Sequence, residues 1–172
     1  QIIVVEGQEG IISNENTNGL IGYWKMDEAT STATTTTFDA SGNGYHGTLT
    51  NGPTRSTSTC KVSNCLSFDG TNDHIVSGTT TMPGSSGTGM SITAWVYPTA
   101  RQSVSDRDMI FRQNGYLTIT PTGQLSTYFY GLVSEGYHNG NAIIPLNTWA
   151  HLVVTYSSTT GAINMYINGA LD

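Results

Sequence analysis

The stretch MSITAWVYP, residues 90–98, alternates between two kinds of side chain with a period of two residues. Ile92, Ala94 and Val96 share one face of an extended segment, and the residues between them share the other. This alternation is typical of a strand with one buried face. Similar short segments recur at spacings of roughly ten residues, which is the pattern of an antiparallel sandwich or barrel. The sequence therefore predicts an all-β fold of antiparallel strands.

Composition supports this prediction and excludes other classes of protein. Only 10% of the 172 residues are charged, and Gly, Thr, Ser and Asn are abundant, so helical bundles are disfavoured. A net charge of −6 without any run of Lys or Arg argues against a nucleic-acid partner. Apolar runs stay far below the ~20 residues that a membrane-spanning helix needs, so we expect no membrane insertion.

Turn residues divide the chain into expected strands. The segment 29–37, rich in Thr and Ser, is expected to form a loop or a weak edge strand. Residues 1–18 are expected to form an N-terminal strand or arm with a linker, and residues 19–172 one domain. The other expected strands are 20–26, 47–50, 65–68, 74–77, 90–98, 108–113, 115–121, 124–133, 141–145, 149–157 and 162–169.

The only two cysteines, Cys60 and Cys65, have four residues between them in TCKVSNC. A thioredoxin-like redox site would have two, and a zinc site would need further Cys or His nearby. We therefore predict a disulfide that closes a small loop, with two reduced thiols as the alternative. A disulfide indicates a secreted or cell-surface protein.

Several segments together resemble a known family. In chain order they are GLIGYWKMDE, FDASGNGYHGTLT, CLSFDGTNDHIV, MSITAWVYP, LNTWAHLVVTY and INMYINGAL. They are similar to the laminin-G-like, or concanavalin A-like lectin/glucanase, jelly-roll family over about residues 20–172. The resemblance implies an antiparallel two-sheet jelly-roll sandwich, commonly with a calcium ion. Most members are secreted or surface modules that bind glycans or proteins, and some relatives are glycoside hydrolases.

The end of the chain departs from the family pattern. Members usually continue past the NGAL turn into further strands, so the domain is expected to lack the family's last strands. The N-terminal segment QIIVVEG is a candidate replacement strand. It would pair either within the chain or with a neighbouring subunit, and the second case predicts self-assembly through residues 1–12.

The resemblance places a calcium loop at FDASGNGYHGTLT, residues 38–50. Calcium prefers carboxylate, carbonyl and amide oxygens, which a glycine-rich turn can direct towards one point. The alternative is an Asx-turn in which Asp39 caps the amides of Ser41 and Gly42. A second acidic turn, FDGTNDH at 68–74, is expected to be a simple turn, with Asp69 or Asp73 as a second metal ligand as the alternative. The expected calcium ligands are Asp39, Asn43, Gly44, His46 through its carbonyl, and Asp172, with Asp27 as the alternative to Asp172.

Tyrosines mark a candidate ligand-binding surface, because a sugar ring stacks its C–H face on an aromatic ring. Tyr128 and Tyr130 alternate in one strand and share a face, whereas Tyr137 and His138 are expected in a loop. Arg112 is expected to add hydrogen bonds to the ligand. The alternative is that these tyrosines only cover the sheet.

The sequence offers little for catalysis. Glucanases of the superfamily carry E-x-D-x-x-E or a close variant, which is absent here, and a G-x-S-x-G elbow is absent too. Asp106 and Asp108 are two residues apart, but their SDRDM context indicates a solvated turn. We therefore predict a non-catalytic, calcium-stabilised recognition module that binds carbohydrate or a surface protein. The alternative is a structural subunit of a surface filament, joined through the N-terminal strand.

Overall fold

The computed structural model describes the backbone of residues 3–5 and residues 19–29, 35–77, 89–102, 108–112, 115–130 and 136–172 in full. The described residues form strands and turns, without a helix, and the paired strands are antiparallel. The prediction of an all-β antiparallel fold is thus confirmed. The chain divides into an N-terminal unit, Ile3–Thr80, and a C-terminal unit made of Gln1–Ile2 and Thr81–Asp172.

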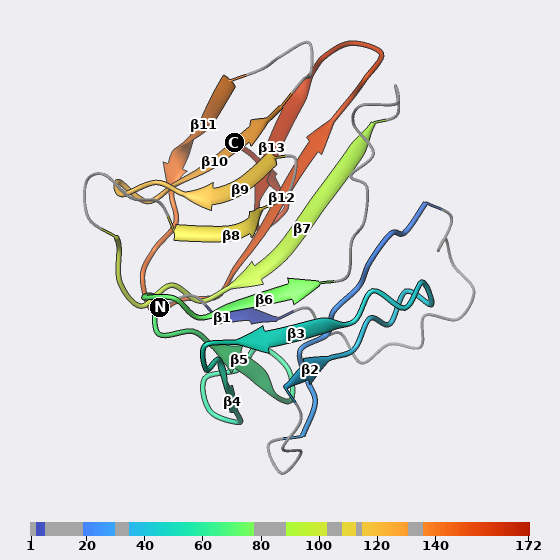
Figure 1. Ribbon diagram of the computed structural model, residues 1–172. Helices are drawn as coiled ribbons and strands as arrows, with labels where there is room; N and C mark the ends of the chain where they lie inside the picture. Colours follow the sequence, from blue (N-terminus) through green and yellow to red (C-terminus); the bar gives the residue numbers. More distant parts are fainter. Residues whose placement is uncertain are drawn as a thin grey trace. The chain divides into compact units, whose positions relative to one another are not determined.

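The C-terminal unit contains two layers of strands (Figure 1). The order in one layer is β14-β13-β12-β7, and the order in the four-stranded sheet is β11-β10-β9-β8. The first layer comprises β7 (Met90–Val96), β12 (Ala150–Tyr156), β13 (Ile163–Ile167) and β14 (Ala170–Leu171). The four-stranded sheet comprises β8 (Asp108–Arg112), β9 (Gly115–Ile119), β10 (Gln124–Phe129) and β11 (Gly136–Ile143).

The core of this unit lies between the two layers. Ala94 and Val96 are buried as the alternation in 90–98 predicts, and Trp95 between them is half-buried on the other face. Phe129 of β10 contacts Tyr156 of β12 with ring centroids 5.9 Å apart. Each large apolar side chain buried in this way contributes about 1.5–3 kcal/mol. The fully buried residues also include Leu117, Ile119, Leu125, Ile144, Leu152 and Val154.

The outer face of β7 and β12 carries a second set of aromatic rings. Trp95 stacks on His151, with centroids 4.9 Å apart and ring planes inclined by 28°. The Nε2 atom of His151 lies 2.7 Å from the hydroxyl of Thr93. Burial lowers the pKa of His151, so its ring is neutral at physiological pH. His151 is thus a strand residue whose ring is hydrogen-bonded.

The N-terminal unit also contains two sheets, ordered β1-β5-β4 and β2-β3-β6. β1 pairs with β5 of the same chain, with Ile3 opposite Ser67, so the expected N-terminal strand finds a partner within the chain. Residues 1, 2 and 6–18, and thus most of the predicted arm, lie outside the described residues. The strands are β1 (Ile3–Val5), β2 (Thr36–Thr37), β3 (Gly47–Thr50), β4 (Thr54–Ser56), β5 (Cys65–Ser67) and β6 (His74–Ser77).

One predicted strand, 20–26, is wrong. In this segment only Trp24 forms a bridge, and its partner is Asp39. Side chains bind the backbone here instead of a neighbouring strand: Asn43 Nδ2 donates to the carbonyls of Leu20 and Ile21. The apolar residues of 20–26 therefore do not form a strand, and its carbonyls accept hydrogen bonds from the loop that contains Asn43.

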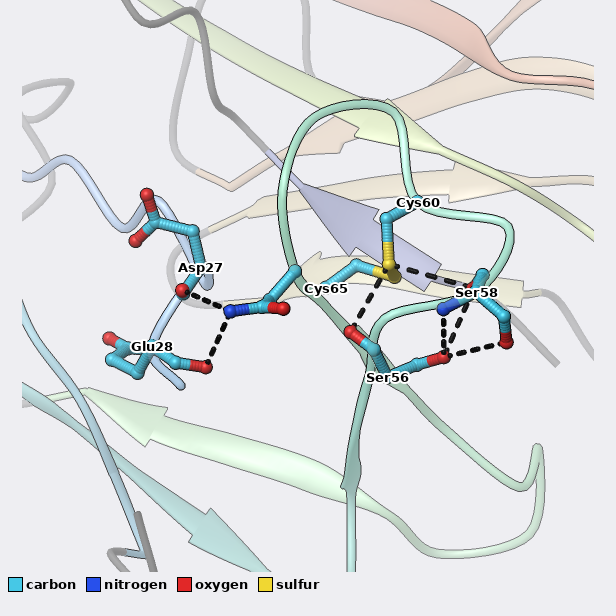
Figure 2. Close-up of a disulfide and its surroundings, with 7 residues drawn as sticks. Asp27, Glu28, Ser56, Ser58, Cys60 and Cys65 are labelled. Carbon is cyan, nitrogen blue, oxygen red and sulfur yellow. Dashed lines mark hydrogen bonds between the residues drawn. A yellow bond between two sulfur atoms is a disulfide. The ribbon is translucent and has the colours of Figure 1, made fainter. Parts of the chain in front are cut away.

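The predicted disulfide between Cys60 and Cys65 is present, with Cα atoms 5.5 Å apart (Figure 2). It closes the loop between β4 and β5, and Sγ of Cys60 lies 3.3 Å from the carbonyl oxygen of Ser56. The neighbouring Asn64 side chain donates to the backbone carbonyl of Asp27 at 2.9 Å. The loop is therefore attached to the segment around residue 27 as well as closed on itself.

A buried ion pair joins three segments of the N-terminal unit. Nη1 of Arg55 lies 2.6 Å from Oε2 of Glu28, and both side chains are largely shielded from solvent. Oε1 of Glu28 accepts from the Thr37 hydroxyl and from the amide of Phe38. Burial raises the pKa of Glu28, but these hydrogen bonds and that of Arg55 outweigh it, so the pKa lies below its ordinary value.

Candidate functional site

Strand register aligns a row of side chains across the four-stranded sheet. Arg112 of β8 lies opposite Tyr116 of β9, which lies opposite Tyr128 of β10, which lies opposite Tyr137 of β11. Neighbouring strands are about 4.8 Å apart, so directly opposed rings come into contact. Ring centroids are 5.9 Å apart for Tyr116 and Tyr128 and 4.9 Å apart for Tyr128 and Tyr137. One aromatic row thus crosses three strands.

Tyr130, two residues after Tyr128, extends this row into a cluster. Its ring centroid lies 4.7 Å from that of Tyr128 and 5.6 Å from that of Tyr116. We call Tyr116, Tyr128, Tyr130 and Tyr137 the tyrosine cluster. The rings are inclined to one another by 46–75°, so the cluster presents a ridged rather than a flat surface.

The period of two residues decides which face the cluster occupies. Leu125 and Phe129 of β10 point into the core and are buried, so Tyr128 between them points to the opposite face. Tyr130 is 48% exposed and Tyr137 is 52% exposed, so both large aromatic side chains are in contact with water. Exposed aromatic side chains that gather on one face are typical of binding surfaces.

Arg112 supplies a positive charge at one end of the row. Its guanidinium carbon lies 5.5 Å from the centroid of the Tyr116 ring, within the range of a cation–π interaction. Asp108, on the same strand, is only 5% exposed and pairs with the core residue Ile119, so its carboxylate does not belong to this surface. The interpretation of Asp108 as part of a solvated turn is therefore wrong. The row therefore combines aromatic faces, phenolic hydroxyls and one guanidinium group.

Two of the phenols interact directly with each other. The hydroxyls of Tyr116 and Tyr130 form a hydrogen bond. This bond, with partial desolvation and the neighbouring phenols, raises the pKa of Tyr130 to about 12. Tyr130 is therefore neutral at physiological pH, and its hydroxyl can donate and accept hydrogen bonds.

The structure brings together four of the five residues predicted to bind a ligand: Arg112, Tyr128, Tyr130 and Tyr137. The fifth, His138, is adjacent to Tyr137 on β11 and lies opposite the buried Thr127, so it faces away from the cluster. The prediction of a loop at Tyr137 and His138 is wrong, because β11 begins at Gly136. Sequence reasoning missed Tyr116, which the register of the β9–β10 hairpin brings opposite Tyr128.

In the predicted calcium loop, protein N–H and O–H groups surround the carboxylate of Asp39. Asp39 is 7% exposed, and its carboxylate accepts four hydrogen bonds. Oδ1 accepts from the amides of Tyr23 and Ser41, and Oδ2 accepts from the Ser41 hydroxyl and the amide of Tyr45. Burial raises the pKa of Asp39, but these bonds outweigh it and hold the pKa below its ordinary value.

A carboxylate has about four lone-pair sites, and in Asp39 protein donors occupy all four. The Asp39 carboxylate as placed therefore does not fit a calcium ligand, and the arrangement fits the alternative of a capping turn. The capped amides differ partly from those expected, since Tyr23 and Tyr45 are bound and Gly42 is not among the donors. The calcium prediction itself stays a prediction.

The side chains of His46 and Asn43 have hydrogen-bond partners of their own. The Nδ1 atom of His46 accepts from the amide of Asp39, and Asn43 donates to the 20–21 carbonyls. Gly44 adopts a φ of 77°, which favours glycine. Among the described residues no group of three or more His, Cys, Asp and Glu is arranged to hold a metal ion.

Asp172, the last expected calcium ligand, belongs to the C-terminal unit and binds β11. Its Oδ1 accepts from the amides of Asn141 and Ala142, at 3.0 and 2.8 Å. These amides lie where the β10–β11 register shifts, so the carboxylate caps an irregularity in the strand. A Cβ at Gly140 would lie 1.9 Å from Oδ2 of Asp172, so only glycine leaves room for this contact.

The antiparallel strands of this fold are those of a β-sandwich domain, and comparison with known proteins agrees. A model of the concanavalin A-like lectin/glucanases superfamily, of the laminin G type, matches residues 69–172. The chain belongs to this family. Neither the curated proteins nor the solved structures contain a significant match.

Membership of the family has consequences for function. It places the chain among modules that bind carbohydrate or protein. Laminin G-like domains are generally non-catalytic, although the superfamily includes glucanases, and they are typically extracellular. The disulfide fits such a location. In the part of the chain that the structure describes, no helix is long and apolar enough to cross a membrane.

Proposed function

We propose that the protein is an exported, non-catalytic recognition module that binds a carbohydrate chain across the tyrosine cluster. The observation that carries the proposal is the register that aligns Arg112, Tyr116, Tyr128 and Tyr137 across four strands. A cluster held by core strands is preorganised, so little conformational entropy is lost when a ligand binds.

Each part of the cluster has a role in this mechanism. The apolar C–H face of a sugar ring stacks on a tyrosine ring, and the phenolic hydroxyls exchange hydrogen bonds with the sugar hydroxyls. The ridged arrangement, with Tyr128 contacting Tyr130 and Tyr137, offers ring faces in several orientations. A chain that bends or branches therefore fits this surface better than a flat crystalline polymer.

Arg112 adds a preference for acidic sugars. Its planar guanidinium presents a fork of donors that matches a carboxylate in two parallel hydrogen bonds. It lies at the β8 end of the row, next to Tyr116. A uronic acid bound on Tyr116 would place its carboxylate close to this group.

The alternative function, a filament subunit joined through the N-terminal strand, receives no specific support. β1 pairs with β5 of the same chain, through Val4 and Leu66. Calcium has no part in the proposed mechanism, because the lone pairs of Asp39 are occupied by protein donors.

A glycan array followed by titration calorimetry on the best ligand tests the proposal. Tyr128→Ala and Tyr137→Ala should each weaken binding by about tenfold or more, since the loss of one stacked ring costs about 1.4 kcal/mol or more. Tyr166→Ala is the matched control, because Tyr166 lies in the other layer, on β13. Unchanged affinity in both cluster variants, or equal loss in the control, would refute the proposal.

A further inference from the structure

The phenol pair Tyr116–Tyr130 has a geometry that suits a covalent reaction. The two hydroxyls are hydrogen-bonded, the ring centroids are 5.6 Å apart and the ring planes are inclined by 75°. The residues belong to one hairpin, next to the cross-strand pair Gly115 and Phe129. Tyr130 is 48% exposed, so a small oxidant or a surface-acting enzyme can reach it.

One-electron oxidation of a tyrosine gives a phenoxyl radical whose unpaired electron is shared between the oxygen and the ortho (Cε) carbons. Two such radicals couple through their Cε atoms to give dityrosine, in which the two hydroxyls flank the new C–C bond. A pair whose hydroxyls already meet therefore holds the reacting carbons near each other. Such proximity converts an encounter between molecules into an intramolecular step.

We propose that Tyr116 and Tyr130 form an intramolecular dityrosine cross-link when a haem peroxidase and hydrogen peroxide act on the protein. Each phenol loses one hydrogen atom, as an electron and a proton, and a Cε–Cε bond forms between the two radicals. The ortho hydrogens then move to the oxygens and restore both phenols. The two electrons and two protons reduce one hydrogen peroxide to two waters.

The cross-link would fasten the open end of the β9–β10 hairpin. A turn closes the other end, where the amide of Gly123 donates to the carbonyl of Thr120. Joining Tyr116 to Tyr130 converts the hairpin into a closed ring and fixes the spacing of two rings in the tyrosine cluster. The inference is independent of the proposed function, since it depends on the phenols alone.

Dilute protein treated with a haem peroxidase and one equivalent of peroxide tests the proposal. The expected product is a monomer lighter by two hydrogen atoms, with dityrosine fluorescence and a peptide map that joins Tyr116 to Tyr130. Oxidation of methionine increases the mass by that of an oxygen atom, whereas the cross-link decreases it, so mass spectrometry distinguishes the two products. The described cysteines are already paired in a disulfide. Tyr116→Phe and Tyr130→Phe keep the ring but remove a phenol, and each should lose the monomeric product.

Tyr137→Phe is the matched control and should retain the cross-link, because its ring contact is with Tyr128. Circular dichroism confirms that each variant is folded. The proposal is overturned if the monomeric product persists in Tyr130→Phe, or if it maps to Tyr128 and Tyr130. It is also overturned if the wild type gives only dimers or no dityrosine.

Discussion

Replacing Asp39 by alanine removes the acceptor of four hydrogen bonds in a side chain that is 7% exposed. A hydrogen bond to a charged group contributes about 1.5–3 kcal/mol. The Ser41 hydroxyl can rotate towards water, and the Ser41 amide belongs to the same local turn, so we count only the amides of Tyr23 and Tyr45. Two such bonds give an expected loss of about 3–6 kcal/mol, a large part of the 5–15 kcal/mol that is typical of a domain.

Urea unfolding followed by circular dichroism, with and without EDTA, measures this loss. Asp27→Ala is the matched control: it also removes one carboxylate, but from a partly exposed ion pair with Lys25 worth about 1 kcal/mol or less. We expect EDTA to leave the wild type unchanged. If EDTA destabilises the wild type as much as Asp39→Ala does, and added calcium reverses it, then the ion holds the loop and the capping argument is refuted.

Two further predictions concern buried charges. Arg55→Leu should lower the free energy of unfolding by about 3–5 kcal/mol, because it leaves Glu28 buried without its ion partner. Adding Glu28→Leu should recover part of this loss in the same urea titration. A loss below about 1 kcal/mol for Arg55→Leu alone would show that the ion pair is not effectively buried. Burial raises the pKa of Asp108, and the charge of Arg101 offsets it only partly, so the folded state binds a proton more tightly than the unfolded state. The free energy of unfolding of the wild type, relative to that of Asp108→Asn, should therefore fall as the pH rises from the ordinary pKa of Asp through the raised pKa of Asp108. A rise over this pH range would contradict the raised pKa.

Much of the strand content was predictable because alternation and turn residues are local signals. MSITAWVYP shows its period directly, and β7 buries Ala94 and Val96 as expected. The segment 20–26 has a similar apolar character but does not form a hydrogen-bond ladder with a neighbouring strand. Instead, Asn43 in a loop donates to the carbonyls of this segment. A single sequence does not show whether a strand-like segment pairs with another strand or with side chains.

The binding surface was predictable only in part. Tyr128 and Tyr130 share a face by their spacing alone, which sequence shows. Their meeting with Tyr116 and Tyr137 depends on the register between strands, which the turn lengths and the irregularity in β10–β11 set. Gly136, Gly140 and Asn139 made β11 look like a loop, but an edge strand with such an irregularity accepts these residues.

The D-x-S-G-N-G turn shows why a calcium site and a capping turn are hard to distinguish by sequence alone. Both need a carboxylate beside a glycine-rich backbone, since the same freedom of φ can aim either carbonyls or amides at one point. At Asp39 the amides of Tyr23, Ser41 and Tyr45 converge on the carboxylate, and amide hydrogens repel a cation as surely as carbonyl oxygens attract it. Tyr23 is sixteen residues from Asp39, so the decisive donor comes from outside the motif. A donor distant in sequence thus completes the hydrogen bonding of the Asp39 carboxylate, and no pattern within the turn encodes that contact.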